Sequence, residues 1–415
     1  MMNIAILGCG TIGAGVAHLL LDHGELIADR LGTSPVLRHI VDIAELGDPR
    51  LEALRSSGIE TVLEDPTIDL VVETIGGTRV AYDYTRRCLL AGRHVVTSNK
   101  DLVAAHGVEL LELANSMKVR YLFEAAVGGG IPVIATLAED LAANRILSIH
   151  GIVNGTTNYI LDRMETDSQN FAESLAEAQR LGYAERNPAS DIDGLDSGRK
   201  LAILAALASG RLVDWEQIPI TGIREIEPDD LELARRLGCY LRLIAGMVAT
   251  EDGNMLLRVA PTLVPRRHPL AVARGVYNAI LIHGSEVGDS LLYGQGAGAA
   301  PTASAVLADI TACMRTPWSP AVALSWQAAE ASGLVEEAFS GVLRPRDSET
   351  YERIAELVET DGLDLEPLAD GAGRTVAWRR LATARDGIAD LAGWFATRGA
   401  IEISWLHDLA DGRGD

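Results

Sequence analysis

The N-terminal stretch "NIAILGCGTIGAG" (residues 3–15) is the clearest indication of the fold. A short apolar run ends at Gly8, and Gly10 and Gly13 complete a GxGxxG pattern that opens a long helical segment. Glycine permits the tight turn and lets backbone N–H groups approach a pyrophosphate at the helix N-terminus, where the helix dipole favours anions. A strand, a glycine turn and a helix in this order favour a dinucleotide-binding site over an ordinary turn.

The rest of the first 130 residues alternates between apolar runs and helical patterns. Runs rich in Val and Ile, separated by helices, are typical of a parallel sheet that is covered on both faces. We therefore expect an α/β fold in which residues 1–130 form a Rossmann-like, doubly wound domain, completed by a segment near 295–320. The further runs interpreted as strands are "VLRHIVDIA", "IDLVVETIGG", "HVVTSNK" and "VRYLFEAAVGGG".

The pattern changes at about residue 131. Residues 131–315 mix helical segments with strands and with a hairpin whose turn is marked by "DGN" at 252–254. This predicts a middle α+β domain with an open, largely antiparallel sheet. Residues 335–410 predict a small ferredoxin-like βαββαβ domain. Its expected strands span 339–343, 363–368, 375–381 and 401–406, and its expected helices span 349–358 and 387–396.

Composition limits the kinds of partner and compartment. The chain has 415 residues and a formal net charge of −22, from 36 basic and 58 acidic side chains. A surface this acidic repels phosphate backbones and anionic lipid heads, so we expect neither a nucleic acid nor a membrane as a partner. Four widely spaced cysteines, and an N-terminus without a basic signal-peptide segment, predict a reduced, cytoplasmic protein.

Two charged residues follow strands of the expected parallel sheet. Asp42 lies 29 residues beyond Gly13, at the end of the second strand. Its carboxylate could accept from the ribose 2′-hydroxyl and would repel a 2′-phosphate, which favours NAD(H) over NADP(H), although a solvated strand-end aspartate is the simpler alternative. Lys100 follows the fourth strand, at the edge where doubly wound sheets bind ligands, so we expect it to lie near the nicotinamide rather than on an ordinary surface.

A triple glycine, Gly128 to Gly130, follows Glu124 in the segment "FEAAVGGGIP". So much glycine exposes backbone carbonyl oxygens, which together with a carboxylate are ligands that hard cations prefer. The same glycines would serve equally well as a hinge between domains. Spacing alone leaves an oxygen-lined cation site and a hinge as even alternatives.

Charged residues gather before an apolar helix in "GYAERNPASDIDGLDSGRKLAIL". Asp196 and Lys200 are four residues apart and would share a helix face. Glu185, Asp191 and Asp193 would come from the loop that leads in. Carboxylates around one lysine can bind the ammonium group of a ligand, whereas the commoner role of such charges is a surface salt-bridge network. The dinucleotide-binding pattern upstream favours the ligand site.

Seven segments, in order, resemble the homoserine dehydrogenase family from the N-terminus to about residue 315. They extend over about three-quarters of the chain, and "GTTNYIL" and "GLDSGRK" are the most specific. The resemblance implies reduction of L-aspartate-4-semialdehyde to L-homoserine with NADPH or NADH, a step towards threonine, methionine and isoleucine. The segments are "GCGTIG", "VVETIGG", "TSNK", "FEAAVGGGIP", "IVNGTTNYIL", "GYAERNPASDIDGLDSGRKLAIL" and "YGQGAGAAPTA".

The resemblance also implies roles for individual residues. Lys200 would donate a proton to the aldehyde oxygen, and the catalytic set would be Lys200, Lys100, Asp196 and Glu185. The residues expected to contact the substrate are Gly155, Thr156, Tyr183, Glu185, Asp191 and Asp196. Those expected to contact the cofactor are Gly8, Gly10, Thr11, Ile12, Gly13, Asp42, Thr74, Lys100, Gly296 and Gly298. A monovalent cation, usually sodium, would be bound by Glu124 and by the carbonyls of Val127, Gly129 and Ile131.

Three departures from the family pattern matter. Where many NADP-using members have arginine after the second strand, this chain has Asp42, and where the family often shows "EADP", it has "ERNP" at 185–188. The C-terminal unit resembles an ACT domain, which senses threonine in some members, but "RPRDSET" replaces the usual loop after its first strand. We therefore expect an oligomeric or stabilising role there rather than ligand binding. The family's middle domain commonly builds a dimer, which predicts a homodimer or a higher homo-oligomer.

Two other interpretations stay open. A different amino-acid dehydrogenase could use the same scaffold, or the chain could be a cofactor or amino-acid sensor whose catalytic site has decayed. Both lysines, Glu185 and Asp196 are present, which argues against a decayed site.

Overall fold

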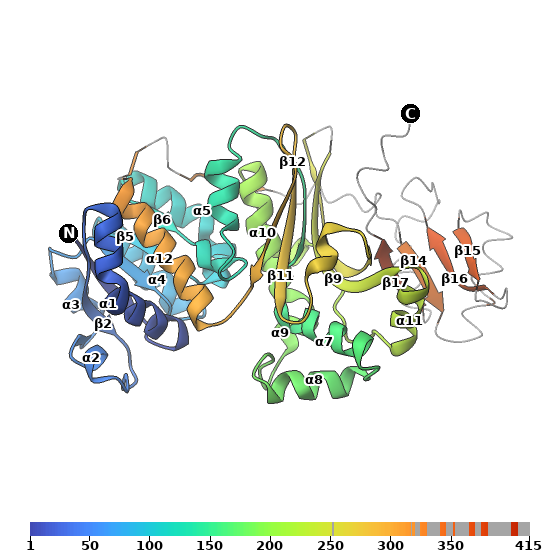
Figure 1. Cartoon of the computed structure of the whole chain (residues 1–415). Helices are drawn as coiled ribbons and strands as arrows, with labels where there is room; N and C mark the ends of the chain where they lie inside the picture. The colour runs from blue at the N-terminus through green and yellow to red at the C-terminus, as the bar shows by residue number, and fades with distance from the viewer. Residues whose placement is uncertain are drawn as a thin grey trace. The chain divides into compact units, whose positions relative to one another are not determined.

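The computed structural model contains two compact units, each formed by segments that are distant in the sequence (Figure 1). The first unit comprises Met1–Ile146, Arg199–Gln217 and His283–Ala331, and the second comprises Leu147–Gly198, Ile218–Ile282 and Ser332–Asp415. The residues that the structure describes are 1–250, 253–316, 318–319, 324–329, 341–345, 352, 365–369, 375–380 and 400–405.

The first unit is built on a six-stranded sheet in which neighbouring strands are parallel. The strand order is β3-β2-β1-β4-β5-β6, which is the order of the doubly wound dinucleotide-binding fold, so the prediction of a Rossmann-like sheet is confirmed. The last predicted strand is shorter than expected, because a 3-10 turn follows it at once. The strands are β1 (Met2–Leu7), β2 (Pro35–Val41), β3 (Arg55–Ser56), β4 (Leu70–Glu73), β5 (His94–Thr97) and β6 (Tyr121–Leu122).

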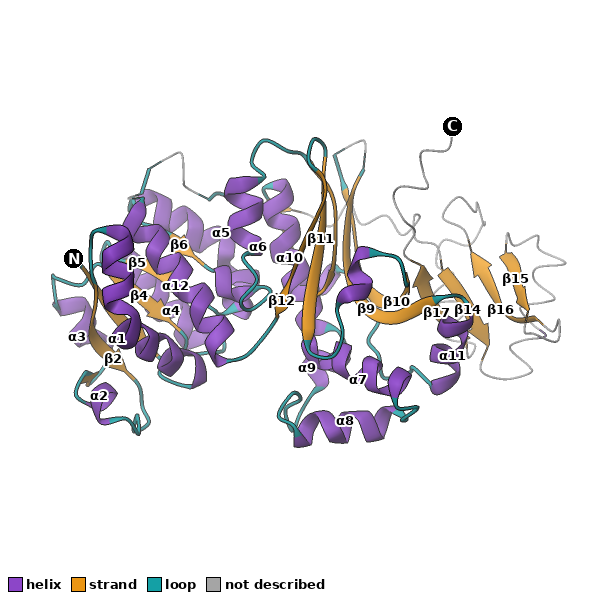
Figure 2. Ribbon diagram, in the orientation of Figure 1, coloured by secondary structure: helices purple, strands orange, loops and turns teal. Residues whose placement is uncertain are grey.

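Helices pack in pairs beside this sheet, α1 with α12 and α4 with α5 (Figure 2). The core beneath α1 and α12 is aliphatic, as the low aromatic content requires, and Ile4, Ile6 and Leu70 are fully buried in it. The helical segments are α1 (Thr11–Leu31), α2 (Pro49–Glu52), α3 (Ile59–Glu64), α4 (Arg79–Leu90), α5 (Lys100–Ser116), η1 (Glu124–Ala126), α6 (Val133–Ala135), η2 (Thr136–Asp140), η3 (Trp215–Gln217) and α12 (Ala299–Arg315). Three further strands of this unit are β8 (Arg211–Val213), β12 (Gly288–Gln295) and β13 (Gln327–Ala329).

The second unit contains a sheet in which β11, β7, β9, β10, β17, β14, β16 and β15 are neighbours in that order. β9 pairs with β7 and with β10 in antiparallel register, so the predicted antiparallel sheet and its hairpin are confirmed. The strands of the N-terminal half of this sheet are β7 (Ile146–Ile152), β9 (Cys239–Ala249), β10 (Met255–Pro265) and β11 (Tyr277–Gly284). The helices are α7 (Gly155–Thr166), α8 (Phe171–Arg180), α9 (Ala189–Ile192), α11 (Pro228–Arg236) and the 3-10 turn η4 (Pro269–Val272); α10 (Leu195–Ser209) continues along the chain into the first unit.

Four C-terminal strands complete that sheet. β14 pairs with β17 and β16, and β15 pairs with β16, in every case antiparallel, whereas β17 pairs with β10 in parallel. The order β17-β14-β16-β15 is the strand order expected of a βαββαβ unit. The two helices expected at 349–358 and 387–396, and most of the "RPRDSET" loop, lie outside the described residues. The strands are β14 (Gly341–Pro345), β15 (Leu365–Ala369), β16 (Thr375–Arg380) and β17 (Ala400–Trp405).

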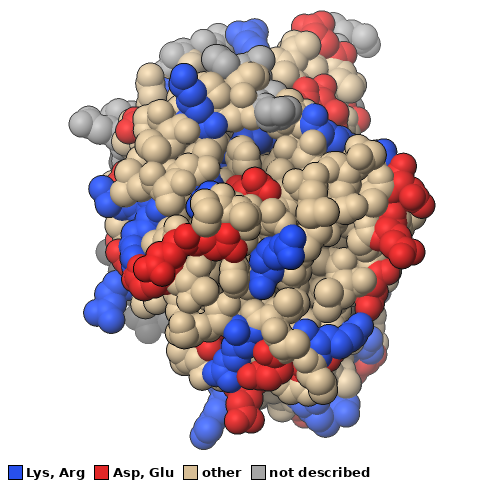
Figure 3. All heavy atoms as spheres, turned by 90° about the vertical axis from the view of Figure 1, so that its left-hand side faces the viewer, with Lys and Arg blue, Asp and Glu red and all other residues tan. Residues whose placement is uncertain are grey.

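Charges of both signs are interspersed on the face of the molecule shown in Figure 3. The first unit has several ion pairs near its surface: Arg50 pairs with Asp22 and Asp48, and Arg87 pairs with Glu60. In the part of the chain that the structure describes, none of the helices is both long enough and apolar enough to span a membrane.

Candidate active site

The glycine loop joins β1 to α1 and requires glycine at two positions. Gly8 has a φ of +88°, and a Cβ on it would lie 2.7 Å from the Thr74 carbonyl oxygen. A Cβ on Gly13 would lie 2.0 Å from the Gly8 carbonyl oxygen. Gly10 has open space around its Cα and caps α1 without a side-chain hydrogen bond from the residues described. The N-terminus of α1 therefore has the form of an anion-binding helix end.

Two other predicted cofactor segments lie beside this loop. The Thr74 hydroxyl donates to the Gly8 carbonyl at 2.6 Å, which ties the end of β4 to the loop. Gly298 is the N-cap of α12, and the carbonyl oxygen of Ala299 would lie 3.4 Å from a Cβ on Gly15 in α1. The structure thus brings the N-terminal turns of α1 and α12 together, which places the "GQGAG" segment next to the glycine loop. α1 begins with Thr11 and Ile12, and Gly296 precedes α12.

Asp42 follows β2 and holds the glycine loop directly. One carboxylate oxygen accepts from the Cys9 backbone N–H at 2.5 Å, and the other accepts from the Ala44 N–H at 2.8 Å. Each oxygen retains acceptor capacity, so the carboxylate can also accept from a ribose hydroxyl. Burial and the nearby Asp42 charge raise the pKa of the Cys9 thiol to about 11, so this cysteine stays protonated at neutral pH.

Lys100 is the first residue of α5, and a capping asparagine fixes where that helix begins. Asn99 accepts from the Leu102 N–H at 3.0 Å through its side-chain oxygen and donates to the Gly77 carbonyl at 2.6 Å. The N-cap side chain therefore connects α5 to the segment that follows β4. Lys100 itself is half-buried. Asn99 was not singled out from the sequence, although an asparagine directly before a helix is a recognisable N-cap signal.

The buried carboxyl group of Glu73 is linked to Asn99 through the Thr97 hydroxyl. Glu73, at the end of β4, is fully buried and accepts from the Thr97 hydroxyl at 2.6 Å and from the Ile75 N–H at 2.7 Å. The Thr97 hydroxyl oxygen in turn accepts from the Asn99 N–H at 2.9 Å. Burial raises the pKa of Glu73, although these hydrogen bonds oppose that effect. The ends of β4 and β5 and the start of α5 are thereby joined by one hydrogen-bonded chain.

Glu124 lies in a buried acidic pair of the first unit. Its two carboxylate oxygens accept from the Ile134 N–H at 2.8 Å and from the Ala135 N–H at 2.7 Å, at the start of α6. Asp309 of α12 accepts from the Glu124 backbone N–H at 2.8 Å. Burial raises the pKa of Glu124, and burial together with the Glu124 charge raises that of Asp309 well above its ordinary value. A bound cation would favour the ionised form of both carboxyl groups.

The backbone around the triple glycine is closely packed. Gly129 has a φ of +57°, and a Cβ on it would lie 2.5 Å from the Gly296 carbonyl oxygen. The Ile131 carbonyl accepts from the Val133 N–H at 2.8 Å and keeps a second lone pair. Val127, Gly129 and Ile131 are buried, so their carbonyl oxygens are held in a fixed loop beside Glu124 in the sequence. The triple glycine therefore makes close backbone contacts within the first unit.

Asn154 holds two predicted substrate carboxylates together in the second unit. Its side-chain nitrogen donates to Asp191 at 2.7 Å and to Asp196 at 2.9 Å. Its side-chain oxygen accepts from the Thr157 N–H at 2.9 Å and so caps α7. Asn154 and Asp196 are each 5% exposed. The sequence interpretation did not include Asn154, although it stands directly before a predicted helix and could have been identified as an N-cap.

The other residues of the "NGTTN" turn contact the segment around Tyr183. The Thr156 hydroxyl donates to the Tyr183 carbonyl at 2.6 Å, and the Tyr183 ring packs on Tyr159 with centroids 5.0 Å apart. Tyr183 remains 44% exposed. A Cβ on Gly155 would lie 2.8 Å from the Val276 carbonyl oxygen, so only glycine fits there.

Two of the acidic residues grouped by the sequence are not bonded to Asn154 in the hydrogen bonds described above. Asp193 forms a two-point ion pair with Arg224. Glu185 is exposed, its backbone carbonyl accepts from Gln179 at 3.0 Å, and among the described residues it is not part of the Asn154 hydrogen bonds.

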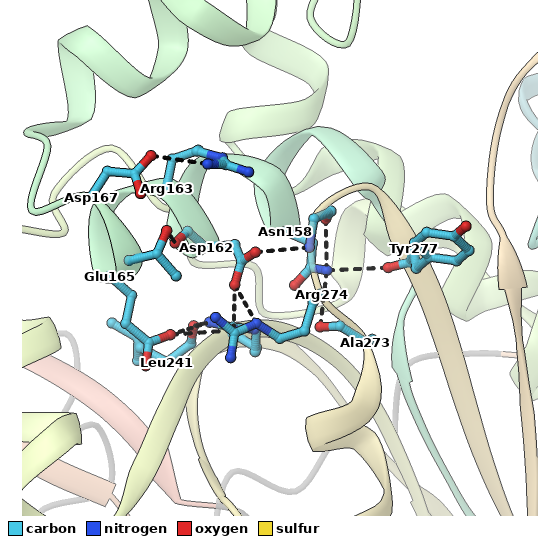
Figure 4. Close-up of polar contacts among 12 residues, drawn as sticks. Asn158, Asp162, Arg163, Glu165, Asp167, Leu241, Ala273, Arg274 and Tyr277 are labelled. Carbon is cyan, nitrogen blue, oxygen red and sulfur yellow. Dashed lines mark hydrogen bonds and ion pairs between the residues drawn. The ribbon is translucent and has the colours of Figure 1, made fainter.

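A polar network along α7 holds the loop at residues 273–277 (Figure 4). Asn158 donates to three backbone carbonyls of that loop, and Asp162 accepts from Arg274 at 2.5 Å and from Arg242 at 3.1 Å. Arg242 is 1% exposed and also pairs with Glu165 at 3.3 Å, so its charge is compensated in the interior. The carbonyls are those of Ala273, Gly275 and Tyr277, at 3.2, 2.9 and 3.1 Å.

α10 carries the second predicted lysine. Asp196 lies in its first turn, and Lys200 follows four residues later, about one helical turn along. Lys200 is half-buried. Its neighbour Arg199 pairs with Asp101 of α5 at 3.3 Å and lies 4.2 Å from the centre of the Trp215 ring.

Comparisons with known proteins match both halves of this arrangement. Residues 8–124 match the family model described as homoserine dehydrogenase, NAD binding domain, and residues 132–311 match the model described as homoserine dehydrogenase. A homoserine dehydrogenase of Synechocystis is 43% identical over 74% of this chain and 72% of the relative. One of Lactococcus lactis is 36% identical over 90% of each chain. The chain belongs to the homoserine dehydrogenase family.

Solved structures agree with this assignment. A homoserine dehydrogenase of Thiobacillus denitrificans aligns over 98% of each chain with a TM-score of 0.84 and 32% identity. A hyperthermophilic archaeal homoserine dehydrogenase in complex with NADPH covers 74% of this chain and 96% of its own, with a TM-score of 0.63 and 28% identity. The predicted resemblance is confirmed, and the chain is an NAD(P)-dependent oxidoreductase that converts L-aspartate-4-semialdehyde to L-homoserine.

Proposed function

We propose that Lys200 donates the proton to the aldehyde oxygen when L-aspartate-4-semialdehyde is reduced. The observation that supports this best is the start of α10, where Asp196 is held by Asn154 and Lys200 follows one turn later. Negative charge develops on the carbonyl oxygen as hydride reaches the carbonyl carbon. An ammonium group within hydrogen-bonding distance stabilises that charge and supplies the proton.

The lysine content of the chain supports this role. Of the 36 basic residues only three are lysines, at positions 100, 118 and 200. Arginine does not release its proton in proteins, whereas lysine can, so a chain that uses arginine almost throughout retains lysine where a proton must move. Two of its three lysines are the two that the family resemblance marks as functional.

The carboxylates in the second unit would bind the ammonium group of the amino-acid substrate. Asn154 donates one hydrogen to Asp191 and one to Asp196, which orders both carboxylates for the ligand. Glu185, which is exposed, would approach the same ammonium group when substrate is present. Gly155, Thr156 and Tyr183 would line the pocket.

The first unit would hold the dinucleotide, which supplies the hydride when bound. Its pyrophosphate would lie at the N-terminus of α1, with Thr74, Gly296 and Gly298 beside it and Lys100 toward the nicotinamide. We propose NAD(H) as the preferred cofactor because the Asp42 carboxylate would repel a 2′-phosphate. The archaeal relative binds NADPH, so cofactor choice differs from member to member if this proposal holds. The residues proposed to contact it are Gly8, Gly10, Thr11, Ile12, Gly13, Asp42, Thr74, Lys100, Gly296 and Gly298.

Glu124 would bind a monovalent cation, with the carbonyls of Val127, Gly129 and Ile131 as the other ligands. The donor set fits because all four residues are buried, and oxygen ligands suit a hard cation such as sodium. The cation would also offset the repulsion between Glu124 and Asp309.

The assembly and the C-terminal strands belong to the same proposal. We expect a cytoplasmic homodimer or higher homo-oligomer formed through the middle domain, and the four cysteines are free, as a reducing compartment requires. The C-terminal unit would be ACT-like, with a stabilising or oligomeric role. The alternative is that this unit binds threonine. If threonine inhibits this enzyme as strongly as it inhibits family members that sense threonine, the purely stabilising or oligomeric role is refuted.

Replacing Lys200 tests the assignment of the proton donor. Lys200→Ala removes the ammonium group, and Lys200→Arg keeps the charge but not a transferable proton, so we expect both variants to bind NADH and to lose nearly all turnover. NADH fluorescence measures binding, and the fall in NADH absorbance with the semialdehyde measures turnover. Lys118→Arg is the matched control and should leave turnover unchanged. Turnover near the wild-type level in either Lys200 variant would contradict the proposal.

A further inference from the structure

Each of the two functional lysines has a charged neighbour in the sequence, and those neighbours pair with each other. Lys100 begins α5 and is followed by Asp101, and Lys200 in α10 is preceded by Arg199. The Asp101 carboxylate lies 3.3 Å from Nε of Arg199. Both residues belong to the first unit, so the pair joins two of its helices.

Two contacts restrain the Asp101–Arg199 ion pair. The Asp101 oxygen that faces Arg199 is buried and has no hydrogen bond among the described residues, so the guanidinium is the charge that compensates it. The side chains of Arg199 and Asp101 are 20% and 40% exposed, and the Arg199 guanidinium lies 4.2 Å from the centre of the Trp215 ring. Stacking on an aromatic face orients a guanidinium without using its N–H donors. Arg199 is therefore held both by a charge from α5 and by a ring from the segment that follows α10.

We propose that Asp101, Arg199 and Trp215 form a clamp that fixes α10 against the start of α5 and so positions Lys200 for proton donation. The clamp residues are positioning residues, because they act through the helices that carry the lysines. This proposal rests on the proposed role of Lys200. It predicts that the clamp contributes to the rate of the chemical step more than to substrate binding, since a proton donor displaced by a fraction of an ångström loses transition-state stabilisation.

Three variants test the clamp in the full-length enzyme. Asp101→Asn and Arg199→Met each remove one charge, and we expect kcat to fall about tenfold while KM for the semialdehyde changes less than twofold, which is about 1.4 kcal/mol of transition-state stabilisation. The double variant should be no slower than the slower single variant, because the two residues act as one unit. The matched control is the ion pair Glu60–Arg87, also between two helices of the first unit, whose variants Glu60→Gln and Arg87→Met should leave kcat unchanged.

The small number of lysines provides a readout that general loosening of the fold would not reproduce. Protein labelled with ¹³C at lysine Cε contains only three such positions, at 100, 118 and 200. Lys118 lies just beyond the end of α5 and serves as the internal control. In the clamp variants the signals of Lys100 and Lys200 should shift while that of Lys118 stays in place. Arg199→Lys, which keeps the charge but not the planar stacking, should recover part of kcat.

The outcomes separate this proposal from the one on which it rests. Unchanged kcat in both single variants, losses that multiply in the double variant, or shifts of all three lysine signals would each overturn the clamp. Failure of the proton-donor assignment is seen independently, as turnover in Lys200→Ala, whatever the clamp variants do.

Discussion

Asn154 provides the sharpest test of how the substrate carboxylates are arranged. Asn154→Ala removes two donor hydrogen bonds to Asp191 and Asp196 and the cap of α7 in one step. Loss of an N-cap costs about 1 kcal/mol, and a hydrogen bond to a charged group contributes about 1.5–3 kcal/mol. Because Asp191 is half-buried, water can replace part of the bond it loses. We therefore expect unfolding free energy to fall by about 3 kcal/mol.

The control is Asn170, an asparagine that caps a helix and does not contact the substrate carboxylates. Asn170 caps α8 by accepting from the Glu173 N–H at 3.0 Å, and both residues are exposed. Asn170→Ala should cost about 1 kcal/mol, the cap alone. Chemical denaturation of the two variants and the wild type measures the difference, which isolates the part of Asn154 that holds the carboxylates.

Steady-state kinetics should also distinguish Asn154→Ala from Asn170→Ala, through KM for the semialdehyde. With Asp191 and Asp196 released, the substrate ammonium loses a preorganised partner, and a cost of about 1.4 kcal/mol corresponds to a tenfold rise in KM. Asn154→Asp keeps an acceptor for the Thr157 N–H but adds a third negative charge, so it should preserve the cap and still impair binding. If Asn154→Ala destabilises the enzyme no more than Asn170→Ala does and leaves KM unchanged, the reasoning is refuted.

Four other predictions concern the first unit. Gly13→Ala should lose dinucleotide binding, because its Cβ would lie 2.0 Å from a backbone oxygen, whereas Gly10→Ala should fold normally; NADH titration and thermal unfolding compare them. Because the pKa of Asp309 is raised in the folded state, its contribution to stability is present below its ordinary pKa of 3.8 and is lost as pH rises through the folded pKa. Asp309→Asn should therefore stabilise the enzyme at pH 8 but not at pH 4. Urea unfolding measures both, and an equal difference between variant and wild type at the two pH values would contradict this. Sodium chloride should stabilise the wild type at pH 8 more than choline chloride of equal concentration if Glu124 binds the cation. Asp42→Arg should shift kcat/KM toward NADPH, and a wild type that already prefers NADPH would contradict the role given to Asp42.

The fold could be predicted because its determinants are local. The glycine loop is constrained by atoms inside the loop and at the adjoining strand end, as the short distances from Gly8 and Gly13 show. Apolar strands separated by helices allow few arrangements other than a doubly wound parallel sheet. The hairpin of β9 and β10 is equally local, since its strands pair directly across one turn. Such features leave clear patterns in a single sequence.

The site was harder to predict because its partners are distant in the sequence. Asn154 is 37 residues from Asp191 and 42 from Asp196, and no spacing rule connects an amide to carboxylates so far away. Asp191 and Asp193 were grouped because both precede the helix that carries Lys200. Asp193 directly follows the short helix α9, and its side chain pairs with Arg224, 31 residues further along the chain. Sequence proximity therefore revealed neither Arg224 as the partner of Asp193 nor Asn154 as the residue that holds Asp191 and Asp196.

Arginine and lysine have different roles in this chain: the arginines named below form ion pairs, and two of the lysines are proposed to act in the reaction. Arginine makes the fixed pairs: Arg242 is locked in the interior with Asp162, and Arg199 is held between Asp101 and Trp215. Its delocalised charge suits planar, permanent contacts, and it does not exchange its proton at neutral pH. The two lysines with proposed functions lie elsewhere in the sequence: Lys100 shortly after the end of β5, and Lys200 in α10, one turn after Asp196. A chain that could use arginine at these two positions at no cost to turnover would have no evident reason to keep lysine there.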